Sequence, residues 1–232
     1  MTDASFTPVP LARWTIACTL GELLGFGVGG ALGASAFIAI PDPTTLPLAA
    51  MLVLACVIAG LIEGAVLGGM QWLALRTTYR SLPARAWIAT TALAGATGWL
   101  LGSLPPTLVS LLGAPTTGDA PAWDPDLVTT VLVSAALGAV LGAMFGAFQW
   151  LALRRHASGA ARWIAGNACA WALALPWSYV AGGMASAATR PDVMIAIVAG
   201  TGVMMGATVA LVSGLFLRRI APRTRERSLQ VG

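Results

Sequence analysis

Glu22 and Glu63 are acidic residues inside long apolar stretches, where ionisable side chains are rare. A charged carboxylate at the centre of a bilayer costs about 2.5–3.5 kcal/mol or more, so it must be protonated, paired or in contact with water. Neither stretch contains an arginine that could pair with it. Two carboxyl groups in one site tend to hold a proton, and they can equally bind a cation. The two acids therefore predict a proton- or cation-responsive site; the alternative is that both are protonated and hydrogen-bond only to the backbone or to each other.

The two acids are expected at similar depth in the membrane. Glu22 lies eight residues after Trp14, and Glu63 lies nine residues before Trp72. With a rise of 1.5 Å per residue, each is about 12–14 Å from a tryptophan at the same membrane surface. The segments that carry them are consecutive, so the carboxyl groups can lie on adjacent helices. The sequence leaves open which way each side chain faces.

The composition predicts an all-α transmembrane protein. The chain has 232 residues, of which 57% are hydrophobic and 9% charged, and its mean hydropathy is +0.81. A soluble domain carries about 25% charged residues, so this chain has too little polar surface to cover a globule. Six segments have the roughly 20 apolar residues that span a bilayer, and they form a single domain over 1–232. They are 14–40, 48–75, 86–112, 128–153, 163–187 and 193–217.

The distribution of charge predicts the orientation. All 13 basic residues are arginine, and only Arg190 falls on the opposite side from the rest. The positive-inside rule then places both termini, and a short basic tail over 220–232, in the cytoplasm. The net charge of +4 is thus a topology signal, and no nucleic-acid partner is expected. An alternative for residues 1–36 is a secretory signal with a cleavage site at 34–36.

The sequence QWLALR occurs twice, at 71–76 and at 149–154. Each copy follows three glycines spaced four residues apart, and a weaker third copy leads to Arg218. The repeat predicts three parallel two-helix hairpins, 13–80, 85–155 and 162–219, related by a pseudo-threefold axis along the membrane normal. The glycines are Gly60, Gly64 and Gly68 in one copy and Gly138, Gly142 and Gly146 in the other.

Glycine stripes of this kind let membrane helices approach closely. Gln71 and Gln149 fall on the glycine faces, so their amides are expected to hydrogen-bond to a neighbouring helix. Asn167 is expected to do the same. The alternative for the two glutamines is that they line a polar cavity.

The repeated motif resembles a loose group of uncharacterised bacterial multispanning proteins with GxxxGxxQWLxLR hairpins. The resemblance covers all six segments and rests on the two QWLALR copies. It implies the hairpin repeat and a bacterial inner membrane. It brings no known activity, so it assigns no functional residue.

Other features give little support for catalysis. The single histidine, His156, lies among arginines in a loop, and the sequence has no HExxH motif or Walker loop. No catalytic residue and no metal site is predicted, and the sequence names no cofactor. Proline is expected to end or bend the third segment at 105–106 and to interrupt the fifth at Pro176. An aromatic belt is expected at the outer surface, formed by Trp99, Trp123, Trp177 and Tyr179.

The sequence thus favours a protein that moves or senses a small solute or cation. Glu22 and Glu63 are the candidate protonatable site, and Gln71, Gln149 and Asn167 are further candidate polar contacts. The main alternative is a non-catalytic accessory or scaffold subunit of a membrane complex, docked through its glycine-rich faces. A third is an enzyme that acts on lipids. The expected partners are the lipid bilayer and either another membrane protein or a second copy of the chain.

Overall fold

A computed structural model describes residues 6–113, 126–184 and 190–223 of the chain. These residues form six helices and two short strands. The all-α class is therefore confirmed, and the helices begin and end within a few residues of the predicted segments. The elements are α1 (Leu11–Ala39), α2 (Leu46–Leu75), α3 (Ala84–Leu111), α4 (Leu127–Leu153), β1 (Ala157–Ser158), α5 (Arg162–Met184), α6 (Pro191–Leu217) and β2 (Ala221–Pro222).

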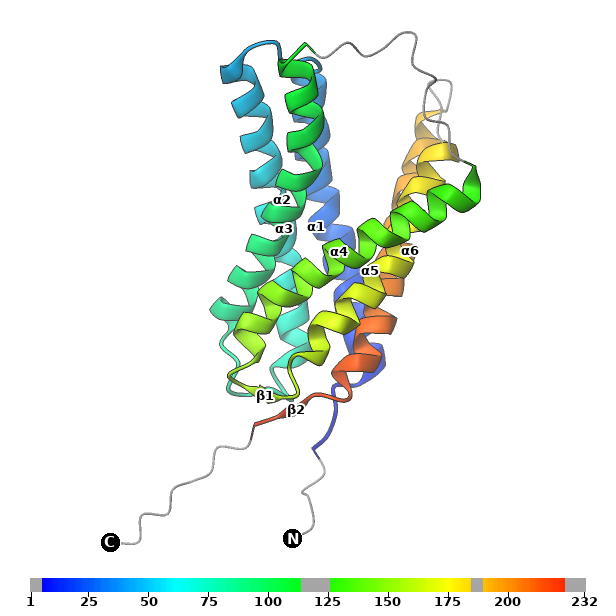
Figure 1. The fold of residues 1–232 in the computed structure, drawn as a ribbon. Helices are drawn as coiled ribbons and strands as arrows, with labels where there is room; N and C mark the ends of the chain where they lie inside the picture. Colours follow the sequence, from blue (N-terminus) through cyan, green and yellow to red (C-terminus); the bar gives the residue numbers. More distant parts are fainter. Residues whose placement is uncertain (1–5, 114–125, 185–189, 224–232) are drawn as a thin grey trace, which may run out of the picture.

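The helices close a ring in sequence order, since each packs against the next and α6 packs against α1 (Figure 1). At one end, which we call the arginine end, α2, α4 and α6 finish at Arg76, Arg154 and Arg218. All six helices lie close together there. Toward the opposite end, α1, α2 and α3 separate from α4, α5 and α6 (Figure 1). The bundle is thus closed at the arginine end and divided into two groups at the other.

Four helices of the described residues are long and apolar enough to cross a membrane: α1, α2, α4 and Asp192–Leu217 of α6. Six were predicted. Helices α3 and α5 fall short in apolar content because hydroxyl, amide and glycine residues interrupt them. Some of these polar side chains, such as Thr91 and Asn167, are buried inside the ring. Large aliphatic side chains face outward instead, for example Ile38 and Val140, as suits contact with lipid.

The glycine stripes of α2 and α4 lie inside the ring, each against the next helix. A Cβ atom at Gly64 would lie 2.4 Å from the carbonyl oxygen of Thr91 on α3. At Gly142 it would lie 2.2 Å from the carbonyl oxygen of Asn167 on α5. Only a residue without a side chain permits such an approach. These faces are therefore covered by helices of the same chain, and an accessory subunit could not dock on them as the scaffold alternative requires.

The prolines neither end α3 nor interrupt α5, so those two expectations were wrong. Helix α3 continues through Pro105 and Pro106 to Leu111, and α5 continues through Pro176 to Met184. Proline lacks a backbone donor and its ring crowds the carbonyl four residues earlier, but packing against neighbouring helices lets a membrane helix continue past it.

The connections at the arginine end are tied together by the chain that follows α6. The hydroxyl of Tyr79 donates a hydrogen bond of 2.6 Å to the carbonyl of Ile220. Strand β1 pairs with β2, and the amide of Arg223 donates to the carbonyl of His156 at 2.8 Å. Ile220 is fully buried. Residues 220–223 of the basic tail predicted over 220–232 therefore belong to the folded body; residues 224–232 lie outside the described part.

Tyr79→Phe is expected to reduce the loss of stability at alkaline pH. Burial raises the pKa of Tyr79, so the folded protein keeps the phenol proton at pH values where the unfolded chain loses it. The stabilisation is fully present below the unfolded pKa of about 10 and is lost as the pH rises above it. Between about pH 8 and pH 10.5, the thermal midpoint in detergent should fall further for the natural protein than for the variant. Equal falls would contradict this assignment.

Candidate functional site

A cavity of about 570 Å³ lies between the six helices, and each helix contributes to its lining. It begins at the depth of the two acids and extends away from the arginine end, where Phe37 and Met194 line it near the ends of α1 and α6. This is the half of the bundle in which the two groups of helices separate (Figure 1). The ring thus encloses a space that the helix repeat alone did not predict.

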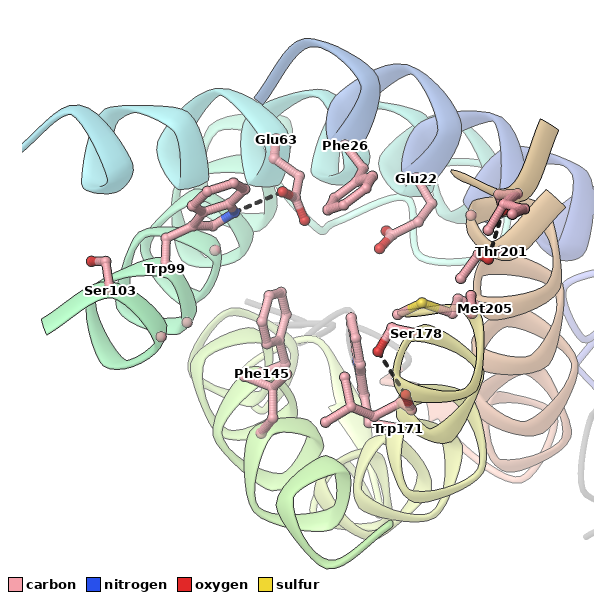
Figure 2. Close-up of a pocket in the computed structure, with 18 of the residues that line it drawn as sticks. Glu22, Phe26, Glu63, Trp99, Ser103, Phe145, Trp171, Ser178, Thr201 and Met205 are labelled. Carbon is pink, nitrogen blue, oxygen red and sulfur yellow. Dashed lines mark hydrogen bonds between the residues drawn. The ribbon is translucent and has the colours of Figure 1, made fainter. Parts of the chain in front are cut away.

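Both acids point into this cavity, on either side of Phe26 (Figure 2). Glu22 and Glu63 have only 7% and 8% of their surface exposed. Oε2 of Glu63 accepts a hydrogen bond of 2.8 Å from Nε1 of Trp99. Among the residues that the structure describes, the carboxyl group of Glu22 has no hydrogen-bond or ion-pair partner. The structure therefore brings the two acids to one cavity.

Trp99 was expected in an outer aromatic belt, and this was wrong. Its indole lies inside the ring because it is the hydrogen-bond donor to Glu63. Trp177 and Tyr179 are 42% and 48% exposed, which fits a position at the membrane interface. Trp123 lies outside the described residues.

Two aromatic side chains form the wall opposite the acids (Figure 2). The rings of Phe145 on α4 and Trp171 on α5 are 5.4 Å apart between centroids, with an interplanar angle of 31°. Sequence reasoning did not single out either residue. The sequence did contain a signal for Trp171. It lies eight residues after Trp163, and Glu22 lies eight residues after Trp14, which is the equivalent tryptophan of the first helix. The same spacing placed both side chains on the inner face.

A polar layer, formed by Gln71, Thr91 and Gln149, lies on the arginine side of the cavity. Nε2 of Gln149 donates to Oε1 of Gln71 at 2.9 Å and to Oγ1 of Thr91 at 3.0 Å. Trp87 donates to Oε1 of Gln71 at 3.2 Å, and Trp163 donates to Oε1 of Gln149 at 2.9 Å. All these side chains are buried. The side-chain amides of Gln71 and Gln149 therefore join α2, α3, α4 and α5. They hydrogen-bond to each other and do not line the large cavity.

A tryptophan layer, formed by Trp14, Trp87 and Trp163, closes the arginine end behind the polar layer. At most 1% of any of the three side chains is exposed. Trp163 contacts both others, at centroid distances of 5.7 and 5.9 Å. Nε1 of Trp14 donates to Oγ of Ser213 at 3.1 Å. This packed layer therefore separates the cavity from the arginine end.

Among the described residues, Asn167 makes no interhelical side-chain hydrogen bond, contrary to the expectation. Its Nδ2 donates to the carbonyl of Trp163, one turn earlier in α5, at 2.9 Å. The side chain lines a small pocket of about 10 Å³ together with Glu22, Gln71 and Gln149. That volume is at the lower limit for one water molecule. Among the described residues, no wide passage therefore joins Glu22 to the polar layer.

The described residues contain no group of three or more histidine, cysteine, aspartate or glutamate side chains placed to hold a metal ion. His156 lies at the arginine end, with Nδ1 3.0 Å from Oγ of Ser81. Partial burial and the charges of Arg155 and Arg223 lower the pKa of His156, which favours the neutral ring. The acids in the cavity are thus the groups best placed for chemistry with protons or cations.

The site combines an apolar, largely aromatic space with two buried carboxyl groups that have no basic partner. Such groups can exchange protons, bind a positive charge, or do each in turn. No protein-family model matches the chain, and no curated protein or solved structure matches it.

Proposed function

We propose that this protein moves a small solute or cation across a bacterial inner membrane, with Glu22 and Glu63 as the protonatable site. One observation carries the proposal: two buried carboxyl groups, with no basic partner among the described residues, face one cavity between the six helices, and packed tryptophans separate that cavity from the arginine end. A buried carboxyl group with only a structural role would be expected to have hydrogen-bond partners within the protein for its oxygens. The Glu22 carboxyl does not do so among the described residues.

In this proposal all six helices cross the membrane, and both termini lie in the cytoplasm. Helices α3 and α5 are 28 and 23 residues long and complete the ring with the four more apolar helices. Most arginines gather at the end that carries the termini, as the positive-inside rule requires of a cytoplasmic surface. At the other end Arg190 is paired with Asp192 at 2.9 Å. The cavity would then face the outside.

The three hairpins are proposed to be repeats. In support, an indole near the start of each odd-numbered helix donates to a polar side chain on an even-numbered neighbour. These pairs are Trp87 with Gln71, Trp163 with Gln149, and Trp14 with Ser213. Leu141 and Met205 stand where the repeat would place the equivalents of Glu63. The shared packing therefore does not need an acid, which favours a functional role for the two that are present.

Movement across the membrane requires the sealed end to open while the cavity closes. The polar and tryptophan layers lie in the path, so they are the parts that would have to separate. Their indole and amide groups can exchange partners with water or solute more readily than an apolar plug could. Protonation of the carboxyl groups when the solute leaves would let an empty site cross without an unpaired buried charge.

Liposomes that contain the full chain, an internal pH reporter and an acidic interior would test this function. Na⁺, K⁺, tetramethylammonium or tetraethylammonium is added outside, one at a time. At least one should make the interior alkaline faster than in protein-free liposomes, because entry of the cation is coupled to exit of a proton. Glu22→Gln and Glu63→Gln should each slow this exchange about tenfold, since they remove a protonatable group but keep its size.

Asp192→Asn is the matched control, because this acid is exposed and lies outside the cavity. It should exchange cations at the rate of the natural protein. If no cation acts, or if the two glutamine variants exchange as fast as the control, the proposed function is wrong.

A further inference from the structure

We propose that the cavity binds an amphipathic organic monocation, whose charge lies at the two carboxyl groups and whose apolar body lies against the aromatic rings. This inference rests on the function proposed above and names its substrate class. The carboxyl groups are those of Glu22 and Glu63, and the rings are those of Phe26, Trp99, Phe145 and Trp171.

The size of the cavity favours an organic ligand. Its volume of about 570 Å³ lies within the range of about 300–1,000 Å³ that is typical of pockets for drug-sized molecules. An inorganic cation needs a compact shell of oxygen ligands, such as the six to eight of Ca²⁺. The described residues contain no cluster of three or more metal-binding side chains, and most of the lining is apolar. A bare ion would leave this space unfilled.

The two carboxyl groups of the lining favour a positive ligand. Glu22 is more than nine-tenths buried, points into the cavity and has no hydrogen-bond or ion-pair partner among the described residues. Glu63 has a single indole donor, Trp99. An anion would be repelled by any ionised carboxylate, and a neutral ligand would not balance one. A monocation balances one carboxylate, and the second can stay protonated.

The aromatic rings supply the remaining contact. Phe145 and Trp171 lie across the cavity from the acids, and only 6% and 7% of their surfaces are exposed (Figure 2). Phe26 lies between the two carboxyl groups. Aromatic faces attract a desolvated cation and also bury apolar substituents. A ligand with charge and bulk in one molecule can therefore use both walls at once.

Binding should be coupled to a proton. If the empty site holds both carboxyl groups protonated, entry of a monocation ionises one of them and releases about one proton for each ligand bound. Lower pH then favours the empty site. A cation held only by aromatic faces or by detergent would bind without releasing a proton.

The test is equilibrium binding of radiolabelled tetraphenylphosphonium to the purified full chain in detergent. Saturable binding is expected, weaker at about pH 6 than at about pH 8, with proton release in weak buffer. Tetraphenylborate, which has the same shape and the opposite charge, should not compete.

Glu22→Gln should weaken binding about tenfold, as loss of a buried charge partner does. Trp171→Leu should weaken it severalfold, whereas Trp177→Leu, an exposed change on the same helix, should not.

The outcomes separate this inference from the proposed function. If tetraphenylphosphonium does not bind, or binds equally to the Glu22→Gln protein, or is displaced by tetraphenylborate, the substrate class is wrong. Acid-dependent exchange of Na⁺ or K⁺ in liposomes would then still support the proposed function. If the probe binds with the expected variant and pH pattern but no cation drives proton exchange, the binding site stands and the transport function fails.

Discussion

Gly142→Leu is expected to abolish folding. A Cβ atom at this position would lie 2.2 Å from the carbonyl oxygen of Asn167 and 2.8 Å from Cβ of Trp171. No rotamer relieves a clash between Cβ and backbone, so α4 and α5 would have to move apart. Their separation would also pull Gln149 away from Trp163. We expect a cost of about 4–5 kcal/mol or more, comparable with the whole stability of a marginally stable protein.

Gly69→Leu is the matched control, because a Cβ atom at Gly69 meets nothing within 4 Å. Both changes put leucine in place of glycine in a long apolar helix. After extraction in mild detergent, the Gly69 variant should elute as a single monodisperse peak, and the Gly142 variant should aggregate. Recovery of both proteins in equal amounts would mean that α4 and α5 are not packed as the structure describes.

Gln149→Leu is expected to destabilise the protein by about 2–4 kcal/mol, which changes the unfolding constant by a factor of about 30 to 900. Gln149 makes three buried hydrogen bonds, to Gln71, Thr91 and Trp163. Leucine has similar volume, so the cost comes from lost hydrogen bonds and from the orphaned Nε1–H of Trp163. Single hydrogen bonds between membrane helices average only about 0.6 kcal/mol, so a larger effect requires the network.

A double-mutant cycle with Trp163→Phe separates the network from simple packing. Because the phenylalanine variant has no N–H to orphan, Gln149→Leu should cost about 1–2 kcal/mol less in that background. Titration with denaturing detergent measures each variant. If the two changes are additive, the 2.9 Å hydrogen bond between these side chains does not contribute to stability.

Under the proposed function, these two positions would bear on transport as well as on folding. Gly142 lets α4 and α5 approach, and Gln149 links that pair to α2 and α3. The layers that hold the bundle together are therefore the same layers that seal the cavity from the arginine end. A protein that alternates its access must exchange these contacts for others of similar free energy.

The helices were predictable because their cause is local and strong. Long apolar runs must satisfy their backbone hydrogen bonds internally in lipid, and this fixed the type and the bounds of the helices within a few residues. Glycine at every fourth residue predicted close packing, and the distribution of arginine predicted an orientation. The prolines misled because the rule for soluble helices was applied where neighbouring helices let the helix continue.

The partner of each surface could not be predicted in the same way. The sequence placed glycines and glutamines on one face, but it did not show that α2 packs these residues on α3 and α4 packs them on α5. It assigned Trp99 to a membrane interface, whereas the ring turns this indole toward Glu63. A side chain's place along a helix is set by the sequence, but its neighbour is set by how other helices cross it.

The same division holds for the candidate site. The sequence by itself determined that two acids lie at similar depth in adjacent segments without a basic partner, since depth follows from residue count and helical rise. Only the tertiary structure decided that Glu22 and Glu63 face one cavity, that Phe145 and Trp171 form its other wall, and that tryptophans close one end. The physical reason is that a cavity belongs to no single helix: its size and lining depend on the crossing of all six, which involves residues far apart in the chain.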